Sequence, residues 1–326
     1  MPKGNGGCEA GSNRIGTIDM YYLAEVFPWL RKVKLPFTRD QFILLMAAVN
    51  EIFLGIDIYL AHSISGTIVP REWIPIIFGP AAGVLLLVAG IIALKQRNVA
   101  VVLANVVLVS SIIVGLLGAY FHLVRGILPT APAGQRITIS LLIWAPPVIG
   151  PLMFSLVGWM GISASWIESP PDSGRLQLLG GRTLTLPFSK TRAYFIMISL
   201  GILATLISSV LDHARTGFSN PWLWLPTAIG VFSAIVAFLM VVYQKIYRQD
   251  LVVYVISMVL LIVVGLIGLG LHISENLTSE GLVIQERFIR GAPFLAPTLY
   301  SNMGLLGLLV LLDPKEKNRS ETESTG

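Results

Sequence analysis

The chain alternates long apolar runs with short polar segments from about residue 40 to residue 312. Several runs reach the roughly 20 residues that a helix needs to cross the hydrocarbon core of a bilayer. They lack the period-two alternation of a transmembrane β-barrel. The pattern therefore predicts an all-α, polytopic membrane protein with eight transmembrane helices. We place these spans at residues 40–62, 74–95, 98–122, 137–161, 193–213, 222–244, 250–272 and 291–312.

The composition supports this class of protein. Of the 326 residues, 54% are hydrophobic and only 13% are charged, whereas a soluble protein carries roughly 25% charged residues. No apolar stretch with a cleavage site precedes the first span, so we expect no signal peptide. Residues 20–34 are apolar and aromatic with a basic end, which predicts either an interfacial segment or a loosely ordered tail.

The distribution of basic residues predicts the orientation. With the N-terminus in the cytoplasm, 17 of the 23 lysines and arginines lie on the cytoplasmic side and 6 on the opposite side. This bias is expected of a protein with both termini inside, in a cell inner or plasma membrane with the lipid bilayer as its partner. The net charge of +5 reflects this flanking charge and gives no reason to expect a nucleic-acid partner.

Internal similarity indicates that the chain is a duplication. The segment HSISGTIVPREWIP (62–75) shares His, Gly, Pro, Trp and Pro with HARTGFSNPWLWLP (213–226) at an offset of 151 residues. GLLGAYFHL (115–123) matches GLIGLGLHI (265–273) at an offset of 150. Because four spans separate the copies, the repeat is a tandem parallel 4+4 arrangement, with a pseudo-twofold axis along the membrane normal.

A third match links the last spans of the two halves. PVIGPLMFSLVGWMG (147–161) matches PFLAPTLYSNMGLLG (293–307) at an offset of 146. Proline removes a helical hydrogen bond, and in a membrane the freed carbonyl groups need other partners. We therefore expect a bent or partly unwound outer end in spans four and eight, or a simple packing kink.

These boundaries divide the chain into five parts. They are an N-terminal cytoplasmic tail with an interfacial segment (1–39), a first four-helix repeat (40–162), a cytoplasmic linker (163–192), a second four-helix repeat (193–312) and a charged tail that we expect to be disordered (313–326).

All four histidines of the chain fall at the same end of the predicted helices. Spans one, three, five and seven run outward, and each ends near a histidine: His62, His122, His213 and His272. Histidine is a common metal ligand and also binds haem iron. The pattern predicts either one haem b in each half, between the two histidines of that half, or a single transition-metal ion bound by all four.

Nearby residues fit such a site. Gly118 and Gly268 lie one turn below a histidine on the same helix face, and the missing side chain leaves room for a macrocycle or for a neighbouring helix. Asp212 and Glu275 are candidates to orient an imidazole by accepting its second N–H, or are interfacial charges in water. The single Cys8 excludes a disulfide within the chain and a cysteine-based metal site.

A structural role explains the histidine pattern equally well. Histidine at a helix C-terminus can hydrogen-bond the last carbonyl groups and suits the helix dipole. Glycine one turn away is typical of close helix packing in membranes. Duplication of one structural pair would reproduce the pattern, so the two halves are not independent evidence for a ligand.

Polar groups inside the spans are concentrated in the first half. Glu51 and Asp57 lie in span one, and Asn105 lies in span three. A carboxylate near the middle of a membrane is costly and is a functional candidate for that reason. Helical spacing places Glu51 below His62, so a Glu51–Asp57–His62 chain could conduct protons or bind a cation. The alternative is a protonated Glu51 that hydrogen-bonds Asn50, Asn105 or a hydroxyl group.

Three functional interpretations follow. The first is a redox or electron-transfer component that binds haem b or a transition-metal ion at the outer face and belongs to a larger membrane complex. In layout alone the chain is similar to polytopic b-type cytochromes and to some copper-handling membrane proteins. The second is a transporter that uses Glu51 and Asp57, and the third is a structural or assembly subunit without a ligand. The sequence does not decide whether the protein is an enzyme.

Overall fold

The structure is a computed structural model that describes residues 17–18, 23–33, 35–64, 66–243, 245–281 and 283–312. Cys8 and the tail at 313–326 therefore lie outside the described residues. Within the predicted interfacial segment, α1 (Leu23–Val26) and the 3₁₀ turn η1 (Pro28–Lys32) are short helical pieces.

The described part of the chain is mainly helical, with two small sheets and connecting loops. Six helical segments are long and apolar enough to cross a membrane, as expected of a helical membrane protein. Each predicted boundary differs from the observed one by a few residues. The six helices are α2 (Arg39–Ser63), α3 (Trp73–Ala93, preceded by the turn η2 at Pro70–Glu72), α4 (Arg97–Gly126), α7 (Lys190–Ala214), α8 (Trp224–Val242, preceded by the turn η4 at Pro221–Leu223) and α9 (Arg248–Thr278).

Two of the eight predicted spans do not form long helices. The fourth is divided into α5 (Ile139–Trp144) and α6 (Ile149–Ser165). The eighth is helical only in α11 (Thr298–Val310), and α10 (Ile284–Arg290) lies just before its predicted start. Pro146 and Pro147 lie in the first gap, and Pro293 and Pro297 in the second. Since proline lacks the N–H that a helix needs, the expected unwinding is confirmed, and α6 and α11 are shorter than the roughly 20 residues of a full span.

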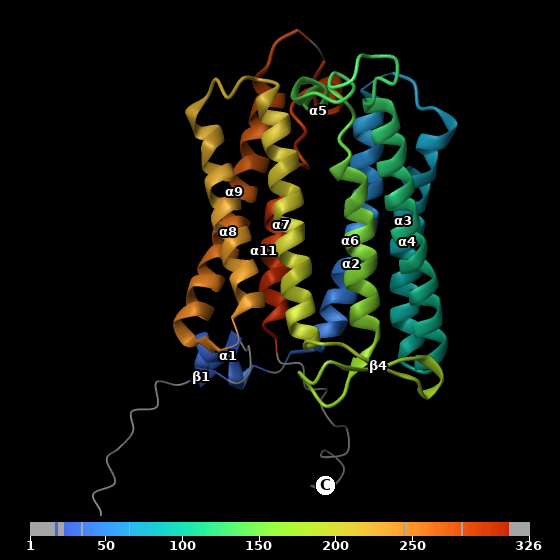
Figure 1. Cartoon of the computed structure of the whole chain (residues 1–326), viewed down its shortest axis with the longest axis vertical. Helices are drawn as coiled ribbons and strands as arrows, with labels where there is room; N and C mark the ends of the chain where they lie inside the picture. The colour runs from blue at the N-terminus through green and yellow to red at the C-terminus, as the bar shows by residue number, and fades with distance from the viewer. Residues whose placement is uncertain are drawn as a thin grey trace, which may run out of the picture.

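The helices form two groups that stand side by side (Figure 1). In the first group α2, α3, α4 and α6 follow one another around a closed ring of contacts, and in the second α7, α8, α9 and α11 do the same. The groups meet where α6 contacts α7 and where α2 contacts α11. Large apolar side chains such as Ile91 and Ile113 are exposed on the outside, whereas Ser111, Ser233 and Ser257 are fully buried, as expected for helices that face lipid.

The two ends of the bundle differ. At one end, here called the linker end, β2 (Ile167–Glu168), β3 (Arg175–Gln177) and β4 (Thr183–Thr185) form an antiparallel sheet between α6 and α7, with the turn η3 (Leu179–Gly181) between β3 and β4. β1 (Thr17–Ile18) pairs with β5 (Ile246–Tyr247) at the same end (Figure 1). The opposite end, with α5 and the four histidines, is called the histidine end.

Candidate functional site

The four histidines lie at the histidine end, half-buried, in two separate pairs. The ring centres of His62 on α2 and His122 on α4 are 6.1 Å apart. His213 on α7 lies close enough to His272 on α9 for their charges to interact. Among the described residues, no three His, Cys, Asp or Glu side chains gather in a metal-binding arrangement, so the four imidazoles do not converge on one ion.

His122 and His272 occupy equivalent hydrogen-bonding positions at the two helix breaks. The Nδ1 atom of His122 lies 2.8 Å from the carbonyl oxygen of Pro147, and that of His272 lies 3.0 Å from the carbonyl oxygen of Pro293. A helix would pair each carbonyl with the N–H four residues later, but Pro151 and Pro297 stand there and have none. The histidines therefore supply the missing donors.

His62 and His213 are bonded differently. The Nδ1 atom of His62 lies 2.9 Å from the carbonyl oxygen of Ile58, one turn earlier in the same helix. The Nδ1 atom of His213 lies 3.5 Å from the Ser209 hydroxyl. A carbonyl only accepts a hydrogen bond, so Nδ1 carries the proton in His62, and a neutral ring would coordinate an ion through Nε2.

The expectation that all four histidines end their helices is only half correct. His62 and His213 are next to last in α2 and α7, but α4 continues four residues beyond His122 and α9 six beyond His272. The part of α9 beyond His272 is held in place by Asn276. Its side chain donates to the carbonyl oxygen of Ala292 and accepts from the N–H of Ala292, both at 2.8 Å.

Proline rings fill the space beside Gly118 and Gly268. A Cβ atom at Gly118 would lie 2.8 Å from Cβ of Pro151, and one at Gly268 would lie 2.7 Å from Cβ of Pro297. The glycines thus allow α4 to pack on α6 and α9 to pack on α11. They leave no room for a macrocycle at these two positions.

Glu51 lies inside the first helix group and is fully buried. Its Oε1 atom is hydrogen-bonded to the Ser111 hydroxyl of α4, which also lies 2.9 Å from the carbonyl oxygen of Phe154 in α6. Its Oε2 atom has no hydrogen-bond partner among the residues that the structure describes. Of the partners considered for a protonated Glu51, the structure thus provides the hydroxyl group.

The other predicted site residues lie elsewhere. Asp57 faces the second helix group, where its charge interacts with that of Asp212 on α7. Asn105 donates to the Val101 carbonyl oxygen at 2.7 Å and accepts from Ser165 at 3.3 Å, near the linker end. The structure therefore does not bring Glu51, Asp57 and Asn105 together as one pathway.

The two predicted orienting carboxylates differ in their surroundings. Asp212 lies close enough to His213 and His272 for electrostatic interaction, and it forms an ion pair of 3.8 Å with Arg215. Glu275 is exposed on α9.

A cavity of about 280 Å³ lies between the two helix groups. It extends along α2 from Ile43 to Asp57, or about 21 Å at the helical rise per residue. Its walls are mainly apolar side chains of α2, α6 and α11. No pattern in the sequence predicted this cavity. The polar groups that line it are Asn50, Asp57, Thr298 and Asn302.

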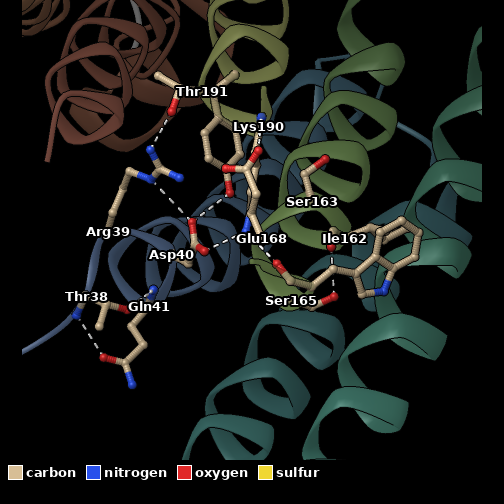
Figure 2. Close-up of polar contacts among 12 residues, drawn as sticks. Thr38, Arg39, Asp40, Gln41, Ile162, Ser163, Ser165, Glu168, Lys190 and Thr191 are labelled. Atoms are coloured by element: carbon tan, nitrogen blue, oxygen red, sulfur yellow. Dashed lines mark hydrogen bonds and ion pairs between the residues drawn. The ribbon is translucent and has the colours of Figure 1, made fainter. Parts of the chain in front are cut away.

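A buried charge cluster joins the groups at the linker end (Figure 2). Lys190 at the start of α7 is 1% exposed, and its Nζ atom lies 2.5 Å from Oδ2 of Asp40 on α2. Arg39, 2% exposed, donates to the Thr191 hydroxyl at 2.8 Å. The Tyr194 hydroxyl donates to Oδ1 of Asp40 at 3.0 Å. The first residues of α2 and the first residues of α7 thus bind each other.

The linker is fixed to this cluster by Glu168. Its Oε1 atom accepts from the backbone N–H groups of Gly174 at 2.7 Å and of Lys190 at 2.9 Å, and its Oε2 atom accepts from that of Asp172 at 3.0 Å. In the sequence, Arg39 and Lys190 are recognisable only as two of the basic residues that flank the spans on the cytoplasmic side. They are 151 residues apart, the same offset as the match between residues 62–75 and 213–226, and this shared offset was the signal that could have predicted a common location.

Comparisons of the chain with protein-family models, with curated proteins and with solved structures gave no match.

Proposed function

We propose that the protein is a permease of a cell inner or plasma membrane. It would bind a small, largely apolar molecule with a hydrogen-bonding group in the cavity between two duplicated four-helix units. The proposal includes eight membrane segments in a parallel 4+4 repeat, with α6 and α11 as the short fourth and eighth segments and both termini in the cytoplasm.

Equivalent contacts in the two groups support the duplication. Ser155 of α6 donates to the Ile112 carbonyl oxygen at 3.0 Å, and Ser301 of α11 donates to the Ile262 carbonyl oxygen at 2.9 Å. The histidine–proline bonds and the glycine–proline contacts also occur once in each group. Such contacts are expected when one ancestral four-helix packing is used twice.

The observation that carries the proposal is the position of the cavity between the groups. Carriers built from repeats bind substrate at the repeat interface and move one repeat against the other. The interface is tight on one side, where a Cβ atom at Gly201 of α7 would lie 2.8 Å from Leu156 of α6. Asn50 occupies the position equivalent to Gly201, 151 residues earlier, and lines the cavity on the other side.

Single-cysteine labelling tests this function without a known substrate. The chain has one cysteine, Cys8, so Cys8→Ser gives a cysteine-free background. We expect Asn50→Cys and Asn302→Cys to react with a membrane-impermeant maleimide in sealed vesicles, because a permease cavity opens to water. The control is Ile113→Cys, which is 58% exposed on the lipid side of α4 and should stay unlabelled. A cavity whose cysteines behave like the control has no water access and is not a transport site.

A second candidate function, binding of a transition-metal ion or haem b in a redox complex, is favoured by the His62–His122 distance. Two Nε2 atoms that share an ion at about 2.0–2.1 Å bring their ring centres to within about 6 Å, close to the 6.1 Å found here. The filled space beside Gly118 favours a bare ion over haem.

Elemental analysis and a reduced-minus-oxidised spectrum of the purified protein test the second candidate. About one metal ion per chain that His62→Ala removes would support it. Protein free of metal and haem after growth with both supplied would leave the permease or a structural subunit.

A further inference from the structure

The contacts of Glu51 contain one hydrogen too few if its carboxyl group is ionised. Ser111 has a single hydroxyl hydrogen, yet its oxygen is in hydrogen-bond contact with both Oε1 of Glu51 and the carbonyl oxygen of Phe154. Both of these partners would be acceptors. One of the two contacts would then join two oxygen atoms with no hydrogen between them, between side chains that are both fully buried.

A proton on Glu51 resolves this deficit. The acid O–H donates to the Ser111 oxygen, and the Ser111 O–H donates to the Phe154 carbonyl oxygen, so that each contact contains one hydrogen. We propose that Glu51 is a proton-binding site, occupied in this conformation, and that the chain Glu51–Ser111–Phe154 holds the proton inside the first helix group.

The surroundings favour a proton over a metal cation. In the part of the chain that the structure describes, Glu51 and its hydrogen-bonded partners contribute four oxygen atoms: two of Glu51, one of Ser111 and one of Phe154. Calcium takes six to eight oxygen ligands and magnesium requires an octahedron. Among the described residues no other charged side chain interacts with Glu51. The elements packed around it present Gly79 of α3 and the groups already named from α4 and α6.

The second helix group provides an internal comparison. The repeat offsets of 151 and 150 residues place Ile202 opposite Glu51 and Leu261 opposite Ser111. Both are fully buried. An apolar pair therefore fills the same place in a similar packing, and the four-helix fold does not depend on a carboxyl group there.

The proton site lies directly behind the wall of the central cavity. Ala47 and Leu54, one turn before and after Glu51, line the cavity, and so do Met153 and Val157 on either side of Phe154. A ligand that shifts α2 against α6 would break the hydrogen-bonded chain and release the proton. This coupling rests on the proposed permease function, whereas the proton site itself does not.

Infrared spectroscopy of the full-length protein in lipid nanodiscs at neutral pH tests the site. The wild-type minus Glu51→Gln difference spectrum should contain one carboxylic-acid C=O band that shifts in D₂O. Ser111→Ala should move this band to a higher frequency without removing it, because the acid loses its acceptor. A difference spectrum that contains carboxylate bands and no acid band would overturn the proposal.

A second variant keeps the test decisive if Glu51→Gln does not fold. The double substitution Glu51→Ile with Ser111→Leu copies the second group and should fold with unchanged or higher thermal stability while losing the acid band. An acid band that persists in this folded variant belongs to another residue and would also overturn the proposal. If the acid band is present but the cavity cysteines stay unlabelled, only the permease proposal is contradicted. If the cysteines are labelled but the acid band is absent, only the proton site is contradicted.

Discussion

His122 donates from Nδ1 to the carbonyl oxygen of Pro147 at 2.8 Å, in place of the backbone N–H that Pro151 lacks. The pair of His272 and Pro293 repeats this relationship at 3.0 Å. A break in a membrane helix frees carbonyl groups that lipid cannot solvate, so the two histidines stabilise the two breaks. This explains why histidine and a Pro-x-x-x-Pro segment occur together in each half.

His122→Ala should destabilise the protein by about 1 kcal/mol, the usual net value of a hydrogen bond. His62→Ala should cost less, because the Ile58 carbonyl oxygen keeps its helical N–H partner. The measurement is the fraction of purified protein that stays monodisperse on size-exclusion chromatography after heating. Equal losses for the two variants would contradict the assignment of a helix-bridging role to His122 and not to His62.

The six long helices could be predicted from the sequence because each apolar run ends at charged or polar residues. The prolines inside these runs, such as Pro80 of α3, do not break the helix. The helix breaks were also predictable, since they follow from proline chemistry. The positions of α6 and α11 against α4 and α9 were not, because a glycine such as Gly118 is equally compatible with a ligand and with a neighbouring helix. Only the packed structure shows which of them fills the space.

The polar interior was harder to predict than the helices. Glu51 was recognisable as a costly buried group, but its partner Ser111 is 60 residues away and one of many serines. Helical spacing alone suggested a link to Asp57 and His62, yet the packing of α2 turns Glu51 toward α4 and Asp57 toward the second group. Periodicity gives the face on which a residue lies and does not identify the helix that covers it.

The Lys190–Asp40 pair should show strong coupling in a double-mutant cycle. Lys190→Met leaves Asp40 with Arg39, 3.5 Å away, as its charge partner and should cost about 3 kcal/mol, the lower end for a broken buried pair, because Asp40 is also 27% exposed. Asp40→Leu combined with Lys190→Met should cost less than the sum of the two single changes, because neither charge of this pair is left facing an empty place, although Arg39 loses its 3.5 Å ion pair with Asp40. Additive effects in thermal unfolding would mean that the two side chains do not interact.

Asn276 and Glu275 are adjacent residues with opposite expected sensitivities. Asn276 is 1% exposed and makes two hydrogen bonds to Ala292, so Asn276→Ala should cost about 2 kcal/mol by leaving both backbone groups unpaired. Glu275→Ala changes an exposed side chain and should stay within about 0.5 kcal/mol of the wild type. The same heating assay compares them. A larger loss for Glu275→Ala would show that its carboxylate has a partner at the histidine end.

The glycines of α9 allow the sharpest test of helix packing, because two of them lie two residues apart in different surroundings. A Cβ atom at Gly268 would lie 2.7 Å from Cβ of Pro297, whereas no atom of the described residues lies within 4 Å of a Cβ atom at Gly270. Gly268→Ala should therefore push α9 away from α11 and cost about 1–3 kcal/mol. Gly270→Ala should raise stability by about 0.5–1 kcal/mol, because alanine favours the helix over glycine. If Gly268→Ala is tolerated as well as Gly270→Ala, α9 and α11 are not in contact there, and the space beside His272 is open to a ligand.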